Sequence, residues 1–214
     1  MATREQEFED RKQSSFIKRA QSDFTTVAWV LIPVAVGINV IGGTLTNVLR
    51  IPLYLDMIGT ILLAVLAGPY VAVVGGLLTN VVLSFTASPT LLPFGLVQAA
   101  VALAVGYLAV RGWFRIREGK GYLKLVGVAV VVVLVSVIVS SPIVVLVFGG
   151  VTGGPTSVVT GVFLATGQEL ITSVVATQFL VEPVDKIASV FIAYFIAKSV
   201  PERYRPSFGQ KSIS

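Results

Sequence analysis

Residues 57–110 of the chain read MIGTILLAVLAGPYVAVVGGLLTNVVLSFTASPTLLPFGLVQAAVALAVGYLAV, and these 54 residues include no charged side chain. Two further stretches, residues 24–49 and residues 125–168, are also uncharged. A helix needs about 20 apolar residues to cross the hydrocarbon core of a bilayer, so the three blocks have room for about six crossings. The sequence therefore predicts an all-α integral membrane protein, folded as a compact bundle of about six transmembrane helices.

The composition supports this class and excludes several kinds of chemistry. Hydrophobic residues make up 55% of the chain and charged residues 13%, with a mean hydropathy of +0.88, whereas about a quarter of the residues in a soluble domain are charged. The sequence contains no cysteine and no histidine, which removes disulfides, thiolate metal sites and histidine-based catalysis. The acidic residues form no arrangement with a base or nucleophile, so we expect no enzyme, no metal site and no cofactor.

Basic residues gather at three places that predict the orientation of the bundle. They are Arg4, Arg11, Lys12, Lys18 and Arg19; Arg111, Arg115, Arg117, Lys120 and Lys124; and Lys198, Arg203, Arg205 and Lys211. The positive-inside rule assigns all three clusters to the cytoplasm. We therefore expect a multi-pass protein of the cell membrane with a cytoplasmic lead-in at residues 1–23, a helical bundle at residues 24–200 and a cytoplasmic tail at residues 201–214.

The number of crossings depends on the Gly68-Pro69 pair. If residues 1–23 and 111–124 both lie inside, an even number of helices must separate them, which favours a helix break at this pair. The predicted crossings are residues 24–49, 55–67, 70–85, 92–110, 124–148 and a last span that begins at residues 182–186 and ends at residue 199. Residues 156–181 are expected to be re-entrant or to lie on the external side within the bundle, and a seventh crossing there is the alternative.

Small residues recur every four positions across the second and third predicted spans. They are Thr60, Ala64, Gly68, Ala72, Gly76 and Asn80. On a helix this spacing forms a smooth face that another helix can approach closely. Two interpretations stay open, namely packing inside the bundle and docking of another membrane subunit.

Polar residues inside apolar spans are candidates for a binding cavity. Asn39, Asn47 and Asn80 must find hydrogen-bond partners or face a polar cavity, and three such amides in the early spans favour a shared cavity. Asp56 stands where a short external loop, residues 50–56, enters the second span. It is a candidate helix cap, which the helix dipole favours, and a candidate ligand contact, and the two roles can coexist.

Glu169 is the ionisable residue of a second polar group, in which Thr166, Glu169, Ser173 and Thr177 are spaced to share one helical face. An ionisable residue in such a run is a candidate for a functional site, and an ion pair with Lys186 is the alternative. Asp185 and Lys186 are expected at the start of the last span, where the lysine either sits at the interface, neutralises a carboxylate or holds an anionic ligand group.

Several of these residues carry a resemblance to a known family. The run Ile51-Pro52-Leu53-Tyr54-Leu55-Asp56-Met57-Ile58-Gly59-Thr60 and the later Ala67-Gly68-Pro69 and Gly75-Gly76-Leu77-Leu78-Thr79-Asn80 resemble the substrate-binding S components of energy-coupling factor (ECF) transporters. The riboflavin-type and related vitamin-binding members are the most similar group. Pro183-Val184-Asp185-Lys186 and Ser199-Val200-Pro201-Glu202-Arg203 are similar to the last span of that group.

The resemblance implies a bundle of six helices that binds a vitamin or related micronutrient from outside. It also implies two kinds of partner, a transmembrane T component and cytoplasmic ATPase subunits of an ABC importer. Residues 50–56 would close over the pocket, and the face of Ala64, Gly68, Ala72 and Gly76 would contact the T component. The long segment 149–181 departs from the family pattern, and no ATPase motif Gly-x-x-x-x-Gly-Lys-Ser/Thr occurs in the chain.

The sequence thus predicts a substrate-capture subunit of an ECF-type importer, with an apolar external pocket and a few polar groups that orient the ligand. The candidate substrate-binding residues are Asn47, Tyr54, Asp56, Glu169, Asp185 and Lys186. The alternatives are a membrane sensor or regulatory module and a stand-alone facilitator for a small molecule. A small-molecule ligand and the lipid bilayer are expected partners, and nucleic acid is not.

Overall fold

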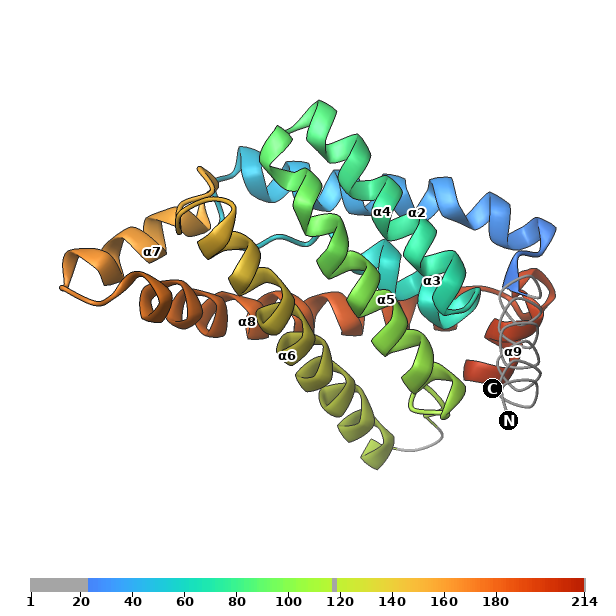
Figure 1. Cartoon of the computed structure of the whole chain (residues 1–214). Coiled ribbons are helices and arrows are strands. Elements are labelled where there is room, and N and C mark those ends of the chain that lie inside the picture. The colour runs from blue at the N-terminus through green and yellow to red at the C-terminus, as the bar shows by residue number, and fades with distance from the viewer. Residues whose placement is uncertain (1–22, 117–118, 214) are drawn as a thin grey trace, which may run out of the picture.

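The computed structural model describes residues 23–116 and 119–213, and within these ranges it consists of eight α-helices, three short 3-10 helices and no β-strand. The predicted lead-in, residues 1–23, lies outside the described residues except for Asp23. The helices are α2 (Thr26–Val48), α3 (Ile58–Leu66), α4 (Pro69–Thr86), α5 (Gly95–Val110), α6 (Tyr122–Leu146), α7 (Thr156–Ala165), α8 (Leu170–Ser199) and α9 (Ser207–Ile213). Figure 1 shows them in a single bundle.

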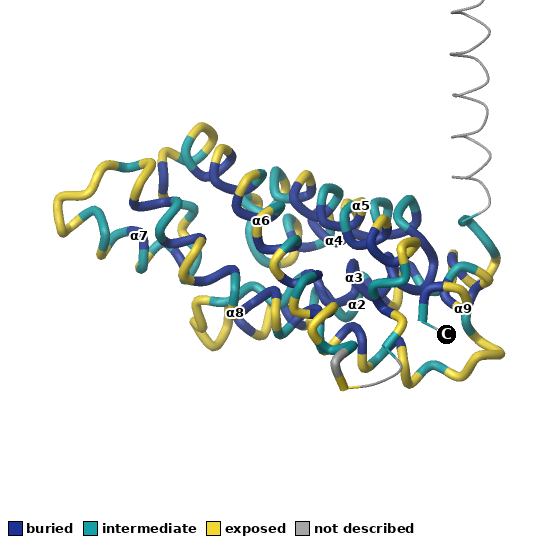
Figure 2. The backbone as a smooth tube through the Cα atoms, turned by 90° about the horizontal axis from the view of Figure 1, so that it is seen from below, coloured by how far each residue is buried: buried dark blue, intermediate teal, exposed yellow. Residues whose placement is uncertain are grey.

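The short helix α3 is the centre of the bundle. All nine of its residues are buried, and it packs against α2, α4, α5, α8 and α9. In Figure 2 its backbone is dark blue at the middle of the molecule, whereas the turn between α7 and α8 is exposed. Nine residues rise only about 14 Å, so α3 is too short to cross a bilayer alone. The second predicted span, residues 55–67, is therefore shorter than expected and enclosed by protein.

The predicted break at Gly68-Pro69 is confirmed. Gly68 adopts a φ of 97°, a conformation that is unfavourable for residues with a Cβ atom. Pro69 occupies the first turn of α4, where a backbone N–H would have no partner within the helix, so the lack of one in proline is not unfavourable. A Cβ atom on Gly68 would also lie 2.6 Å from a carboxylate oxygen of Asp23. This turn therefore brings the beginning of α2 next to the junction of α3 and α4.

Within residues 23–116 and 119–213, four helices are long and apolar enough to cross a membrane. They span Thr26–Val48, Pro69–Thr86, Pro89–Val110 (a 3-10 helix, Pro89–Phe94, continued by α5) and Tyr122–Leu146. Large apolar side chains cover their outward faces, among them Val30, Ile41, Leu96, Val130 and Ile138. Monomeric soluble proteins rarely expose such continuous apolar surface, so these features are those of a multi-pass helical membrane protein. The described residues give four candidate spans, and the count of six crossings stays a prediction.

The predicted boundary at Glu182 is wrong. A single helix of 30 residues, α8, runs from Leu170 through Pro183 to Ser199. Asp185 and Lys186 therefore lie in the middle of a helix and not at its start. The preceding part of the segment 156–181 forms α7, a ten-residue helix that packs on α8 as a hairpin, at the left of Figure 1.

The end of the chain packs against the same end of the bundle as the basic loop after α5. The guanidinium of Arg115 donates hydrogen bonds to the backbone oxygen of Lys211, and the Ser212 hydroxyl donates to the carbonyl of Val65 at 2.6 Å. Arg115 of the second basic cluster and Lys211 of the third therefore lie together at one end of the bundle. Such clustering is what the positive-inside rule requires of cytoplasmic segments.

Candidate functional site

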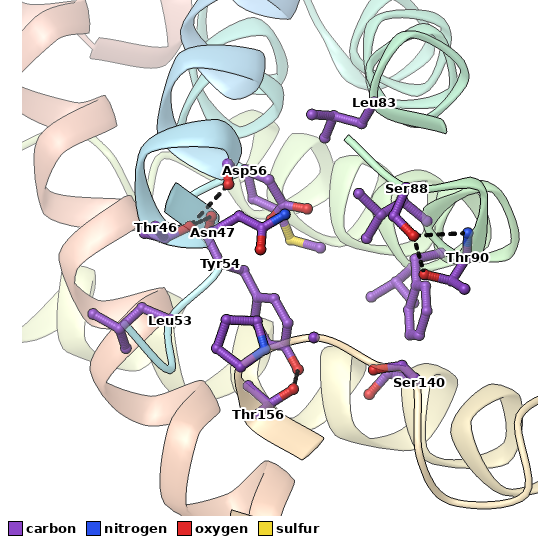
Figure 3. Close-up of a pocket in the computed structure, with 18 of the residues that line it drawn as sticks. Thr46, Asn47, Leu53, Tyr54, Asp56, Leu83, Ser88, Thr90, Ser140 and Thr156 are labelled. Carbon is purple, nitrogen blue, oxygen red and sulfur yellow. Dashed lines mark hydrogen bonds between the residues drawn. The ribbon is translucent and has the colours of Figure 1, made fainter. Parts of the chain in front are cut away.

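A cavity of about 200 Å³ lies where the end of α2, the loop 49–57, the connections α4–α5 and α6–α7, and the middle of α8 meet (Figure 3). It is far larger than the space that one buried water needs. Its apolar lining is Leu53, Met57, Leu83, Leu91, Phe94, Val97 and Pro155. Its polar lining is Thr46, Asn47, Tyr54, Asp56, Ser88, Thr90, Ser140, Thr152, Thr156, Gln178, Glu182 and Lys186.

Tyr54 holds the loop 49–57 against three other segments. Its carbonyl accepts a hydrogen bond from Thr46 of α2 at 3.1 Å, and its phenol donates to Thr156 of α7 at 3.1 Å. Its backbone N–H donates to Asp185 of α8 at 2.9 Å. Tyr54 is therefore held in place at the cavity by α2, which precedes it in the sequence, and by α7 and α8, which follow it.

Asp185 is buried behind this wall. Its Oδ1 accepts from the backbone nitrogens of Tyr54 and Leu55, at 2.9 and 2.7 Å, and its Oδ2 accepts from the Lys186 ammonium at 2.5 Å. Leu55 has a φ of 47°, a left-handed conformation that is unfavourable for a residue with a side chain. Asp185 thus holds the loop in a conformation that it would not adopt alone.

Four charged groups gather at one wall of the cavity. Lys186 is fully buried and lies 3.3 Å from Glu182 Oε2, one helical turn away, in addition to its contact with Asp185. Asp56 lines the same cavity from the loop. The group contains three carboxyl groups and one ammonium, so its formal charge is negative. Buried ions require such compensation, because the desolvation of each one is costly.

Acceptor atoms without donors also belong to this wall. Asp56 Oδ1, Gln178 Oε1 and Glu182 Oε2 are buried and have no hydrogen-bond partner, although Glu182 Oε2 lies within ion-pair distance of Lys186. The amide nitrogen of Gln178 is engaged, because it donates to Ser140 at 2.9 Å. Buried polar atoms are almost always hydrogen-bonded, so a group of orphaned acceptors at a cavity wall is unusual.

A second network of polar side chains lies inside the bundle and reaches the backbone of Asp56 at the cavity. Asn39 donates to Thr60 and Thr79, at 2.9 and 3.1 Å, and accepts from the Gly59 N–H at 2.6 Å. Thr60 donates to Gln98, which donates in turn to the carbonyl of Asp56 at 2.8 Å. These hydrogen bonds connect α2, α3, α4 and α5 to Asp56, which lines the cavity.

The structure brings most of the predicted site residues together. Asn47, Tyr54, Asp56 and Lys186 line one cavity, and Asp185 lies directly behind it. The helix-cap interpretation of Asp56 is wrong, because Met57 takes the N-cap position of α3 and no side chain caps it. Lys186 does not hold a free position for an anionic ligand, since two carboxylates already contact it.

Glu169 is not part of the cavity. It occupies the N-cap position of α8 at the exposed turn after α7, and it is absent from the lining. The alternative ion pair with Lys186 is also wrong, because Lys186 pairs with Glu182 and Asp185. Only Ser173 and Thr177 of the predicted polar face are helical and buried, and Thr177 accepts a hydrogen bond from Thr160 of α7.

The small-residue face is used inside the bundle. Thr60, Ala64, Gly68, Ala72, Gly76 and Asn80 are all buried. A Cβ atom on Gly76 would lie 2.9 Å from Cβ of Gln98, which shows how closely α4 approaches α5 there. The structure therefore favours the internal-packing interpretation over a docking surface at Ala64, Gly68, Ala72 and Gly76. Asn39 and Asn80 likewise bond within the protein, and of the three amides only Asn47 lines the cavity.

Two cavity residues on α8, Gln178 and Glu182, were not predicted. They precede Lys186 by eight and four residues, so the three side chains share one helical face. This spacing was present in the sequence. It was missed because the expected boundary at residue 182 divided the face between two segments.

No protein-family model, curated protein or solved structure matches this chain. The described residues therefore show a helical membrane protein with four candidate spans, and no family is identified.

Proposed function

We propose that this chain is the substrate-capture subunit of an ECF-type importer, and that it binds a vitamin or related micronutrient from the external side. The observation that carries the proposal is the cavity of about 200 Å³ between a fixed loop and the charged middle of α8. Ligand sites in membrane bundles combine an apolar lining with a few oriented polar groups. The lining of this cavity has that mixture.

The direction of the helices supports an external opening. The cavity takes Gly43, Thr46 and Asn47 from the last turns of α2 and Phe94 and Val97 from the start of α5. Arg111 follows the opposite end of α5, and the Arg115 contact to Lys211 is at that end too. If the basic end faces the cytoplasm, the cavity lies in the external half of the bundle.

Ionisable residues inside a membrane bundle are expensive and commonly mark substrate or ion sites. Glu182, Asp185 and Lys186 are at most 3% exposed, and the first and last of them face the cavity. Packing alone does not require charges at these positions, because apolar residues would fill the same space at lower desolvation cost. The desolvation cost of these buried charges supports a role for them in ligand capture.

The partners in the proposal come from the resemblance of residues 51–60, 67–69 and 75–80 to the S components. They are a transmembrane T component and cytoplasmic ATPase subunits, which would supply the energy for release of the ligand to the cytoplasm. Because the small-residue face is buried, a T component would have to contact other surfaces of the bundle, on its lipid-facing side.

The test is purification in detergent from cells grown in rich medium, followed by mass spectrometry of any small molecule released on denaturation. A stoichiometric vitamin-like molecule, together with ATPase subunits in a tagged pull-down, is the expected result. A signalling kinase in the pull-down without ATPases would replace the proposal with the sensor function. Ligand uptake by vesicles that contain this chain alone would replace it with the facilitator.

A further inference from the structure

The charges and orphaned acceptors of the cavity define the chemistry of what can occupy it. We infer that the cavity takes an organic cation, a protonated amine or related nitrogen base with N–H donors, attached to an apolar or ring-shaped body. This inference rests on the proposed function and specifies its substrate class.

The first argument is charge. Asp56 and Glu182 line the cavity, and Asp185 lies behind it, whereas Lys186 is the one cation among the described residues of this wall. The Lys186 ammonium is already shared between Asp185 at 2.5 Å and Glu182 at 3.3 Å. An anionic ligand would therefore meet three carboxyl groups and an ammonium that is already engaged, whereas a cation would find carboxyl groups to pair with.

The second argument is hydrogen bonding, and its main group is an uncharged amide. Gln178 is neutral and 3% exposed, its nitrogen donates to Ser140, and its Oε1 is buried at the cavity wall without a donor. Asp56 Oδ1 is likewise buried without a hydrogen-bond donor, whereas Glu182 Oε2 lies 3.3 Å from the Lys186 ammonium. Gln178 and Asp56 both line the cavity, and a ligand that brings N–H groups would supply the donors that these two oxygens lack.

The third argument concerns the rest of the ligand. Phe94 stacks on Phe148, with ring centroids 5.9 Å apart and an angle of 3° between the planes, and Phe94 also lines the cavity. Leu53, Met57, Leu83 and Val97 complete an apolar side. In Figure 3 Asn47 and Asp56 lie across the cavity from Ser88 and Thr90, with space between them. A bare metal ion would fill little of this volume, and the described residues contain no group of three or more His, Cys, Asp or Glu side chains placed to hold one.

The experiment tests two questions separately, namely whether the protein binds a small molecule and what charge that molecule carries. A small-molecule extract of the producing cells is divided on cation- and anion-exchange resins into a cationic, an anionic and an unretained fraction. Each fraction is added to the purified protein, and the melting temperature is measured, because a ligand that binds the native state raises it. Thiamine and pyridoxamine serve as cationic probes, riboflavin as a neutral probe, and biotin and pantothenate as anionic probes.

We expect the cationic fraction to raise the melting temperature of the wild-type protein. Glu182→Gln and Asp56→Asn should weaken that response at least about tenfold in concentration, since each removes a charge-assisted contact. Glu169→Gln is the matched control, because it makes the same chemical change on an exposed residue outside the cavity, and it should leave the response unchanged.

Stabilisation by the anionic or unretained fraction, with none by the cationic fraction, overturns the inference and leaves the proposed function standing. No stabilisation by any fraction or probe overturns both. If either cavity variant fails to fold, the response of the wild-type protein to the three fractions still decides the charge of the ligand.

Discussion

The Oδ1 atom of Asp185 lies 2.7 Å from the backbone nitrogen of Leu55, so a carboxylate in the middle of α8 fixes a loop that precedes it by 130 residues. Leu55 is one of two described non-glycine residues with positive φ. A left-handed conformation costs about 1–3 kcal/mol and persists only where its surroundings enforce it. Asp185 provides this enforcement and also balances the charge of Lys186.

Asp185→Ala is therefore expected to destabilise the protein by about 3–5 kcal/mol. The change removes the acceptor of two backbone N–H groups and the nearest counter-ion of a fully buried lysine. Thermal or denaturant unfolding in detergent measures it, with Glu169→Ala as the exposed control. A melting temperature equal to that of the wild type would contradict the role given to Asp185.

Asn39→Ala tests the internal network. Asn39 satisfies the Gly59 N–H and two threonine hydroxyls, and each buried group that loses its partner costs about 1–3 kcal/mol. Asn47→Ala, on the same helix at the exposed rim of the cavity, should change stability little while it alters ligand binding. Equal unfolding transitions for the two variants would show that the network contributes nothing.

Gly59→Ala tests the approach of α2 to α3. A Cβ atom at residue 59 would lie 2.0 Å from the carbonyl oxygen of Ala35, so the two helices must separate, at a cost of about 1–3 kcal/mol. Gly37→Ala is the matched control in α2, because nothing lies within 4 Å of the added atom. It should be neutral or slightly stabilising, since alanine favours helices. The comparison of the two melting temperatures measures the effect of the contact.

Single-cysteine variants test the orientation of the bundle, and the native chain has no cysteine to interfere. Gln210→Cys lies on α9 at the basic end, and Thr90→Cys lies at the cavity. An impermeant thiol reagent added outside intact cells should label position 90 and leave position 210 unlabelled. The reverse pattern would invert the bundle and remove the support for external capture.

The break at Gly68-Pro69 and the loop at residues 50–56 were predictable, because they depend on local properties of glycine, proline and charge. The continuity of α8 was not. Glu182, Pro183, Asp185 and Lys186 look like the start of a span, since three charges and a proline are unfavourable inside one. They are tolerated because Lys186 pairs with both acids and the Tyr54 and Leu55 N–H groups reach Asp185.

The candidate site was predictable to the same extent. Asn47 ends the first predicted span, and Tyr54 and Asp56 belong to the loop that follows it, so their closeness in the sequence indicated a shared location. Glu169 was misplaced because its spacing to Ser173 and Thr177 assumes a continuous helix, whereas α8 begins at Leu170. Whether a polar face points into a cavity or to a helix end depends on such boundaries, and periodicity alone does not fix them.

The attachment of Tyr54 to α2, α7 and α8 has a consequence for synthesis in the membrane. A nascent chain emerges from its amino-terminal end, so the loop 49–57 is made long before the residues that hold it, Thr156 and Asp185. Until α8 has been made and has packed against α6 and α3, Leu55 lacks the hydrogen bond to Asp185 that stabilises its left-handed conformation. The cavity is therefore completed only after residue 186 has been made, and a ribosome-bound chain that stops before residue 185 should lack the contacts that hold Tyr54 and Leu55 in place.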